Sequence, residues 1–74
     1  MIYKFKRGDY IQISSVEKMD NSWLGRVGKI KKRNKGKRQG KLSWDAIMYP
    51  DTIIYLYGDE MTKISKEEYF LEVL

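Results

Sequence analysis

Apolar and polar residues alternate in several short stretches of this chain, with the period of two that is typical of half-buried β-strands. In Tyr10–Ser14 the alternation places Ile11 and Ile13 on one face. Thr52–Tyr57 is mostly β-branched or aromatic and lies between turn residues, so it is the strongest predicted strand. Its apolar character on both faces predicts a central place in a sheet. Leu42–Tyr49 fits a strand and nearly fits a helix, and we favour the strand.

The stretch from residue 25 to about residue 33 predicts a further strand that runs into a hairpin. Val27 and Ile30 are its apolar positions. A glycine inside a strand marks a bulge or the close approach of another backbone, and Gly28 has this place. Residues 34–40 contain two glycines and predict the tip of the hairpin.

The end of the chain predicts two more strands and one helical turn. Glu60–Ile64 follows the turn residues Gly58 and Asp59 and is expected to pair with the preceding strand. Ser65–Glu68 begins with Ser and has Glu three residues later, a capping box that predicts one helical turn. Phe70–Leu74 is expected to close the chain as a last strand. Several short strands between turn residues predict an all-β fold, as a small barrel or sandwich.

The length of 74 residues suits a single small domain over residues 1–74. Cys and His are both absent, which excludes disulfides and the usual zinc ligands, and no cofactor or metal is expected. No apolar stretch approaches the roughly 20 residues that cross a bilayer. The charged N-terminal residues are not typical of a signal peptide. We therefore expect a cytoplasmic protein without a membrane partner, in the host cytoplasm if the protein is viral.

Charge is distributed unevenly along the chain. Residues 1–25 contribute +1, residues 26–41 contribute +9 and residues 42–74 contribute −5, which accounts for the net charge of +5. The middle segment contains no acidic residue. A molecule with one strongly basic segment is expected to bind a polyanion through it.

The spacing of the basic residues suits a phosphate backbone. Every second residue from Lys29 to Lys37 is basic, so these side chains would share one face of an extended strand, roughly 6.6 Å apart. Lys32 and Arg38 would fall on the other face or at the tip. Neutralising several phosphates releases counterions and gives affinity without reading the base sequence. The predicted nucleic-acid-binding residues are Arg26, Lys29, Lys31, Lys32, Arg33, Lys35, Lys37, Arg38, Lys41, Trp23 and Trp44.

Different roles are expected within this set. Arg33 and Arg38 are the best candidates for bidentate phosphate contacts, because the planar guanidinium matches that geometry.

Trp23 and Trp44 flank the basic segment in the sequence, so they are the best candidates to stack on bases. In so small a domain most aromatic side chains belong to the core. There are two alternatives to nucleic acid as the partner of the basic segment. The segment could bind an acidic protein surface, or its charges could serve only solubility.

Two segments resemble the opening of SH3-like barrels of the KOW type: Lys-Arg-Gly-Asp-Tyr-Ile-Gln-Ile at residues 6–13 and Gly-Arg-Val-Gly-Lys-Ile at residues 25–30. Those barrels begin with a Lys-Gly-Asp turn, an alternating strand and a Gly-x-x-Gly-x-Val/Ile element. The resemblance implies a small five-stranded SH3-like barrel with one short helical turn before the last strand. KOW domains occur in ribosomal proteins and transcription elongation factors, where they contact RNA or protein. The long loop before Gly25 is closer to the first loop of other SH3-like barrels, such as the small stromal subunit of photosystem I.

We expect a binding module and not an enzyme, because the common general bases and nucleophiles, His and Cys, are missing. Small plasmid-encoded ribonuclease toxins have an SH3-like barrel and a similar Arg-Gly-Asp opening, but their following Arg-Pro element is absent here. The competing function is that of a small viral (phage-like) or mobile-element regulator that binds a host protein machine, such as a polymerase, nuclease or defence complex. The oligomeric state stays open, with Phe70–Leu74 as a strand that could pair with a second copy.

Overall fold

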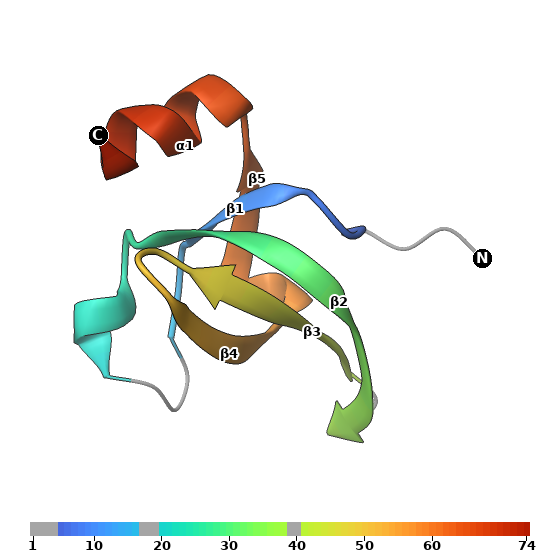
Figure 1. Ribbon diagram of the computed structural model, residues 1–74. Coiled ribbons are helices and arrows are strands. Elements are labelled where there is room, and N and C mark those ends of the chain that lie inside the picture. The colour runs from blue at the N-terminus through green and yellow to red at the C-terminus, as the bar shows by residue number, and fades with distance from the viewer. Residues whose placement is uncertain (1–4, 17–19, 39–40) are drawn as a thin grey trace.

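A computed structural model describes residues 5–16, 20–38 and 41–74, and for residues 35–38 and 41 it describes the backbone alone. The protein is mostly β, with five antiparallel strands in one sheet of order β4-β3-β2-β1-β5. The elements are β1 (Tyr10–Ile13), η1 (Asn21–Trp23), β2 (Val27–Arg38), β3 (Lys41–Met48), β4 (Thr52–Tyr57), η2 (Gly58–Glu60), β5 (Met61–Ile64) and α1 (Lys66–Val73). Figure 1 shows a strongly curved sheet with α1 packed beyond β1 and β5.

The core lies inside this curved sheet and is built from alternate residues of the strands. Ile11 and Ile13 are buried, as their spacing predicts, and so are Val27 and Ile30. The predicted strand at residues 42–49 is confirmed as β3. The full set of buried apolar residues comprises Phe5, Ile11, Ile13, Val27, Ile30, Trp44, Ala46, Met48, Leu56 and Met61.

At Gly28, β3 leaves no room for a side chain on β2, which confirms the close approach that the place of this glycine in the strand predicts. Gly28 is opposite Met48 in the ladder. A Cβ atom at this position would lie 2.5 Å from the Sδ atom of Met48 and 2.8 Å from the carbonyl oxygen of Ile47. Such distances are too short for any side chain, so the packing of β2 against β3 requires glycine here.

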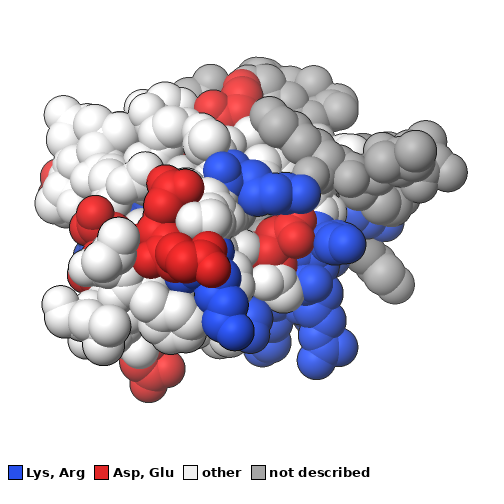
Figure 2. Space-filling view, turned by 90° about the horizontal axis from the view of Figure 1, so that it is seen from above, with Lys and Arg blue, Asp and Glu red and all other residues white. Residues whose placement is uncertain are grey.

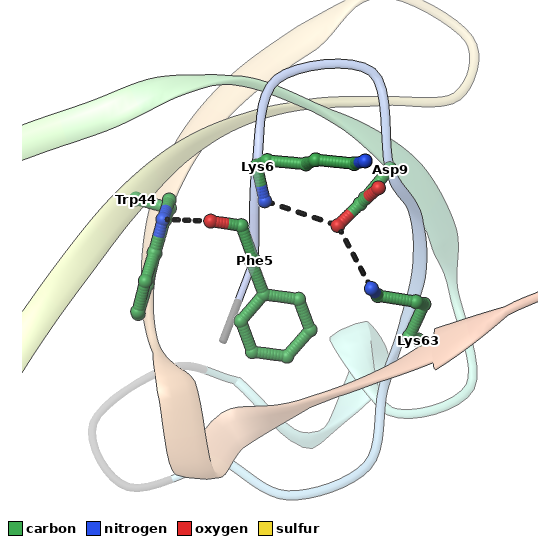
Figure 3. A network of polar contacts seen from close by, with 5 residues as sticks. All are labelled: Phe5, Lys6, Asp9, Trp44 and Lys63. Carbon is green, nitrogen blue, oxygen red and sulfur yellow. Dashed lines mark hydrogen bonds and ion pairs between the residues drawn. The ribbon is translucent and has the colours of Figure 1, made fainter. Parts of the chain in front are cut away.

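The turn before β1 is held by Asp9 (Figure 3). The carboxylate of Asp9 accepts a hydrogen bond from the backbone N–H of Lys6 (3.0 Å) and forms an ion pair with Lys63 of β5 (3.2 Å). Gly8 has a φ of 93°, a value that favours glycine because it carries no Cβ. This turn therefore ties the start of the sheet to its β5 edge.

The strand Thr52–Tyr57 is at an edge of the sheet and not at its centre. β4 pairs with β3 alone in the sheet order, and β5 pairs with β1 instead of forming a hairpin with β4. The prediction was wrong because residues that are apolar on both faces do not distinguish a central strand from an edge strand. On one face Leu56 is buried, whereas Ile53 and Tyr55 on the other face are 55% and 57% exposed.

The last predicted strand, Phe70–Leu74, is wrong, because all of it except Leu74 belongs to the helix α1. Ser65 caps α1 as its sequence predicts, because its Oγ accepts a hydrogen bond from the N–H of Glu68 (3.1 Å). The helix then continues to Val73, since no Gly or Pro interrupts it. The predicted order of one helical turn followed by a last strand is therefore wrong at this place, and a different short turn, η2, precedes the last strand, β5. Neither α1 nor any other helix in the described ranges has the length and apolar character needed to cross a membrane.

Candidate functional site

The basic segment, residues 26–41, contains all of β2 and the first residue of β3. Seven of the twelve residues of β2 are Lys or Arg. β1 pairs with β2 only between Val27 and Lys29, whereas the pairing with β3 continues to Arg38 and Lys41. We call residues 29–41, the far part of this hairpin, the basic arm. Most of it has a single neighbouring strand, and Figure 1 shows it reaching away from the rest of the molecule.

A β-bulge changes which basic residues share a face. The ladder pairs Ile30 with Ala46 and then Lys32 with Asp45, so Lys31 is skipped. Residues directly opposite each other lie on the same face of a sheet. Since Ala46 is buried and Ile47 is exposed, Lys29 and Lys32 both lie on the outer face. The expected single file of every second residue from Lys29 to Lys37 is therefore wrong.

The described basic side chains of the arm differ in exposure. Lys29, Lys31 and Lys32 are exposed, and the ammonium of Lys29 lies 5.6 Å from the ring centre of Tyr10. Arg33 is half-buried and pairs in the ladder with buried Trp44. The side chains of Lys35, Lys37, Arg38 and Lys41 lie outside the described part of the structure, although their backbone belongs to the two strands. The described charge that faces solvent is thus carried by lysines.

Trp44 is a core residue and does not offer a stacking surface. It is 3% exposed, and its indole N–H donates a hydrogen bond to the carbonyl oxygen of Phe5 (3.1 Å; Figure 3). The Phe5 and Trp44 rings meet edge to face, with centres 5.3 Å apart. The prediction from sequence proximity was wrong because Trp44 points to the inner face of β3, opposite to the face that solvent reaches.

Trp23 and Arg26 interact with each other just before β2, at the end of the strand opposite the hairpin tip. The guanidinium of Arg26 lies 4.1 Å above the ring centre of Trp23, and its Nη2 donates a hydrogen bond to the carbonyl oxygen of Tyr49 (3.0 Å). Both side chains are half-buried, and Trp23 also packs against the core. One face of the Trp23 ring is therefore already covered by a cation, so this pair joins η1 to the end of β3.

Exposed apolar side chains gather on the outer face of β3 and β4, a feature that the sequence analysis missed. Ile47 pairs with Ile53 in the ladder, and Asp45 pairs with Tyr55. Ile47 is 38% exposed, and Tyr49 beside the turn is also exposed. The sequence gives no direct signal for this patch, because an apolar strand is expected to be covered on both faces.

Acidic residues lie mostly away from the basic arm. Viewed from the side of α1, the acidic side chains gather mainly toward one end of the molecule and Lys and Arg toward the other (Figure 2). Asp45 is the exception on β3: it pairs with Lys32 in the ladder and accepts a hydrogen bond from the amide of Asn34 (2.8 Å). Within the described ranges, no three carboxylates come close enough together to hold a metal ion.

No protein-family model matches this chain, and no curated protein or solved structure matches it significantly. The arrangement offers two distinct surfaces: a hairpin with exposed ammonium groups, and an apolar outer face that ends at the free edge of β4. The first surface suits a polyanion, and the second suits a protein.

Proposed function

We propose that this domain is a non-catalytic binding module that contacts the phosphate backbone of nucleic acid, RNA or DNA, through the basic arm. The observation that carries this proposal is the density of Lys and Arg in β2, on a hairpin that reaches beyond the other strands. Exposed lysines on such an arm can neutralise phosphates, which releases condensed counterions from the nucleic acid.

The nature of the available side chains sets the expected mode of binding. Lysine acts as a point charge and carries no directional information for base edges. Trp44 is buried, and Trp23 is half-buried with one ring face covered by Arg26, so neither is well placed for base stacking. We therefore infer contacts to the backbone, with weak preference for base sequence.

We also infer that the domain is an SH3-like barrel of the kind that its opening residues resemble. A bent sheet of five antiparallel strands with the turn η2 before the last strand supports this inference. In this arrangement β1, β5 and the Asp9 turn hold the base of β2, and the arm extends from that base.

The test is fluorescence anisotropy of labelled single-stranded and duplex RNA and DNA over a range of salt concentrations. The informative variant is Lys31→Ser with Lys32→Ser, because both side chains are exposed on β2. Its matched control is Arg7→Ser with Lys66→Ser, which removes the same charge from exposed positions outside the arm. A variant with Arg33, Lys35, Lys37 and Arg38 all changed to Ser extends the series to the tip.

We expect the arm variants to weaken binding and to reduce the slope of log affinity against log salt by about 0.7–0.9 for each phosphate that is no longer neutralised. The control should keep the slope of the unchanged protein. An equal loss of affinity in both pairs would contradict a specific role of the arm. Absence of binding at physiological salt would instead favour the protein-directed regulator, whose binding is expected to depend on a few apolar or arginine contacts.

A further inference from the structure

β4 is an open edge that lacks the features by which proteins usually protect such strands. No other strand in the described ranges pairs with its outer side. Its six residues contain no charge, no proline and no glycine, and its ladder with β3 is regular over six pairs. Natural edge strands are typically short, charged, bulged or covered, because an unprotected edge pairs with other chains.

The opposite edge of the same sheet provides an internal comparison. β5 has four residues, and its centre carries Lys63, which is held by the ion pair with Asp9. That edge is both short and charged, so it has the protection that β4 lacks. β4 therefore lacks the structural barriers to pairing with another chain that the β5 edge has.

The side chains beside the β4 edge are suited to an uncharged partner. Ile53 and Tyr55 project from the outer face of β4 and are more than half exposed. Ile47 continues this apolar surface on β3, next to Ile53. The lysines of β2 lie two strands away from the edge, so a chain that adds to β4 meets apolar side chains first.

We propose that the partner of this edge is a second copy of the protein, which pairs antiparallel with β4 through a twofold axis. Glu60 already accepts a hydrogen bond from the N–H of Tyr57 (2.9 Å), so the free stretch of β4 is Thr52–Leu56, with Ile54 at its centre. A symmetric pairing centred on Ile54 places Ile53 of each copy opposite Tyr55 of the other. Aromatic and β-branched residues form favourable cross-strand pairs, and symmetry provides this pair twice.

The charge distribution is compatible with a second copy at this edge. Two molecules of net charge +5 repel each other, but this pairing brings two uncharged strands together. The two β2 strands would be five strand spacings apart, roughly 24 Å before twist. This separation exceeds the Debye length of about 8 Å at physiological salt, so the arms would repel each other weakly. Both basic arms would stay exposed, and the pairing does not depend on the proposed nucleic-acid binding.

A seam of five residues buries less surface than the roughly 1,200–2,000 Å² typical of stable complexes, so we expect a reversible dimer that forms at high concentration. Sedimentation equilibrium of the full chain, from micromolar to millimolar concentration, measures the dissociation constant of this dimer. The test variant is Ile53→Lys with Tyr55→Lys, which places charges opposite each other across the seam. The matched control is Leu71→Lys on α1 with Leu74→Lys directly after it, where both residues are at least 78% exposed.

We expect the unchanged protein and the α1 control to dimerise with similar dissociation constants, and the β4 variant to dissociate at least about tenfold more readily. Concentration-dependent protection of β4 amides from hydrogen exchange, in the unchanged protein, tests the same seam without any substitution. A protein that is monomeric throughout the range would overturn the proposal. So would a dimer that survives in the β4 variant, equal loss of dimer in both variants, or protection confined to α1.

Discussion

β3 lies between two strands of opposite character. On one side, β2 carries seven basic residues and a bulge at Lys31; on the other, β4 is uncharged and regular. Each is paired with β3, yet β2 presents charge on an extended arm while β4 presents apolar side chains on a free edge. Strand pairing alone therefore does not determine what a strand offers to a partner.

The difference between β2 and β4 determines how each would respond to solution conditions. Attraction between ammonium groups and phosphates acts over several ångströms and weakens as salt is added. Pairing of apolar strands acts at contact and depends little on salt, because it is based on backbone hydrogen bonds and buried area. The two surfaces can thus be separated experimentally.

Gly28→Val is expected to have the largest effect, because it breaks the ladder on which both surfaces depend. A side chain at this position would collide with Met48 and with the backbone of Ile47. We expect a loss of about 3 kcal/mol or more of unfolding free energy, a large part of the stability of so small a domain. Urea denaturation measures it, with Lys29→Val as the control at the neighbouring exposed position. Similar stability of the two variants would contradict the tight packing of β2 against β3.

A salt series on the unchanged protein sharpens the comparison between the two surfaces. If the arm makes four phosphate contacts, affinity for nucleic acid should fall roughly a hundredfold between about 50 and 200 mM salt. The dissociation constant of the β4 dimer should change by less than about threefold over the same range, since no charge lies on the seam. Anisotropy and sedimentation equilibrium measure the two quantities. Equal salt dependence of both would show that one charged surface serves both interactions.

The sequence predicts those parts of the fold that depend on local pattern. The alternation of Ile11 and Ile13 and the cap at Ser65 each involve neighbours within a few residues. The order of the strands depends instead on contacts between distant segments. For this reason an apolar strand at residues 52–57 fits a central place and an edge place equally well.

The candidate site was predictable in its charge and not in its geometry. The basic run is visible in the sequence, but the bulge at Lys31 arises from the register between β2 and β3, which no pattern in β2 alone reveals. Likewise, Trp44 lies next to the basic run in the sequence and faces the core in space. The apolar residues of Phe70–Leu74 fit a strand or a helix, and the cap at Ser65 decides for the helix.

Arg26 and Lys32 are expected to differ although both belong to the predicted basic site. Arg26→Gln removes the interactions with Trp23 and with the Tyr49 carbonyl, so it should lower the unfolding free energy by about 1–2 kcal/mol. Its affinity for nucleic acid should change less than twofold. Lys32→Gln should leave stability within about 0.5 kcal/mol and weaken binding severalfold. Urea denaturation measures the stability of both variants, and anisotropy measures their affinity for nucleic acid. A larger loss of affinity in Arg26→Gln than in Lys32→Gln would place Arg26 in the interface.

Asp45→Asn is expected to have the smallest effect, and it tests the boundary between the two surfaces. Asp45 lies on β3 between Lys32 and Tyr55, where its charge offsets part of the attraction of the arm for phosphates. The amide oxygen of Asn still accepts the hydrogen bond from Asn34, so the fold should be retained. We expect affinity for nucleic acid to rise about two- to fivefold at low salt, and less at high salt. Asp51→Asn, in the exposed turn before β4, makes the same change of charge away from β2 and should have a smaller effect. A larger gain from Asp51→Asn would mean that the polyanion lies along β4 instead of β2.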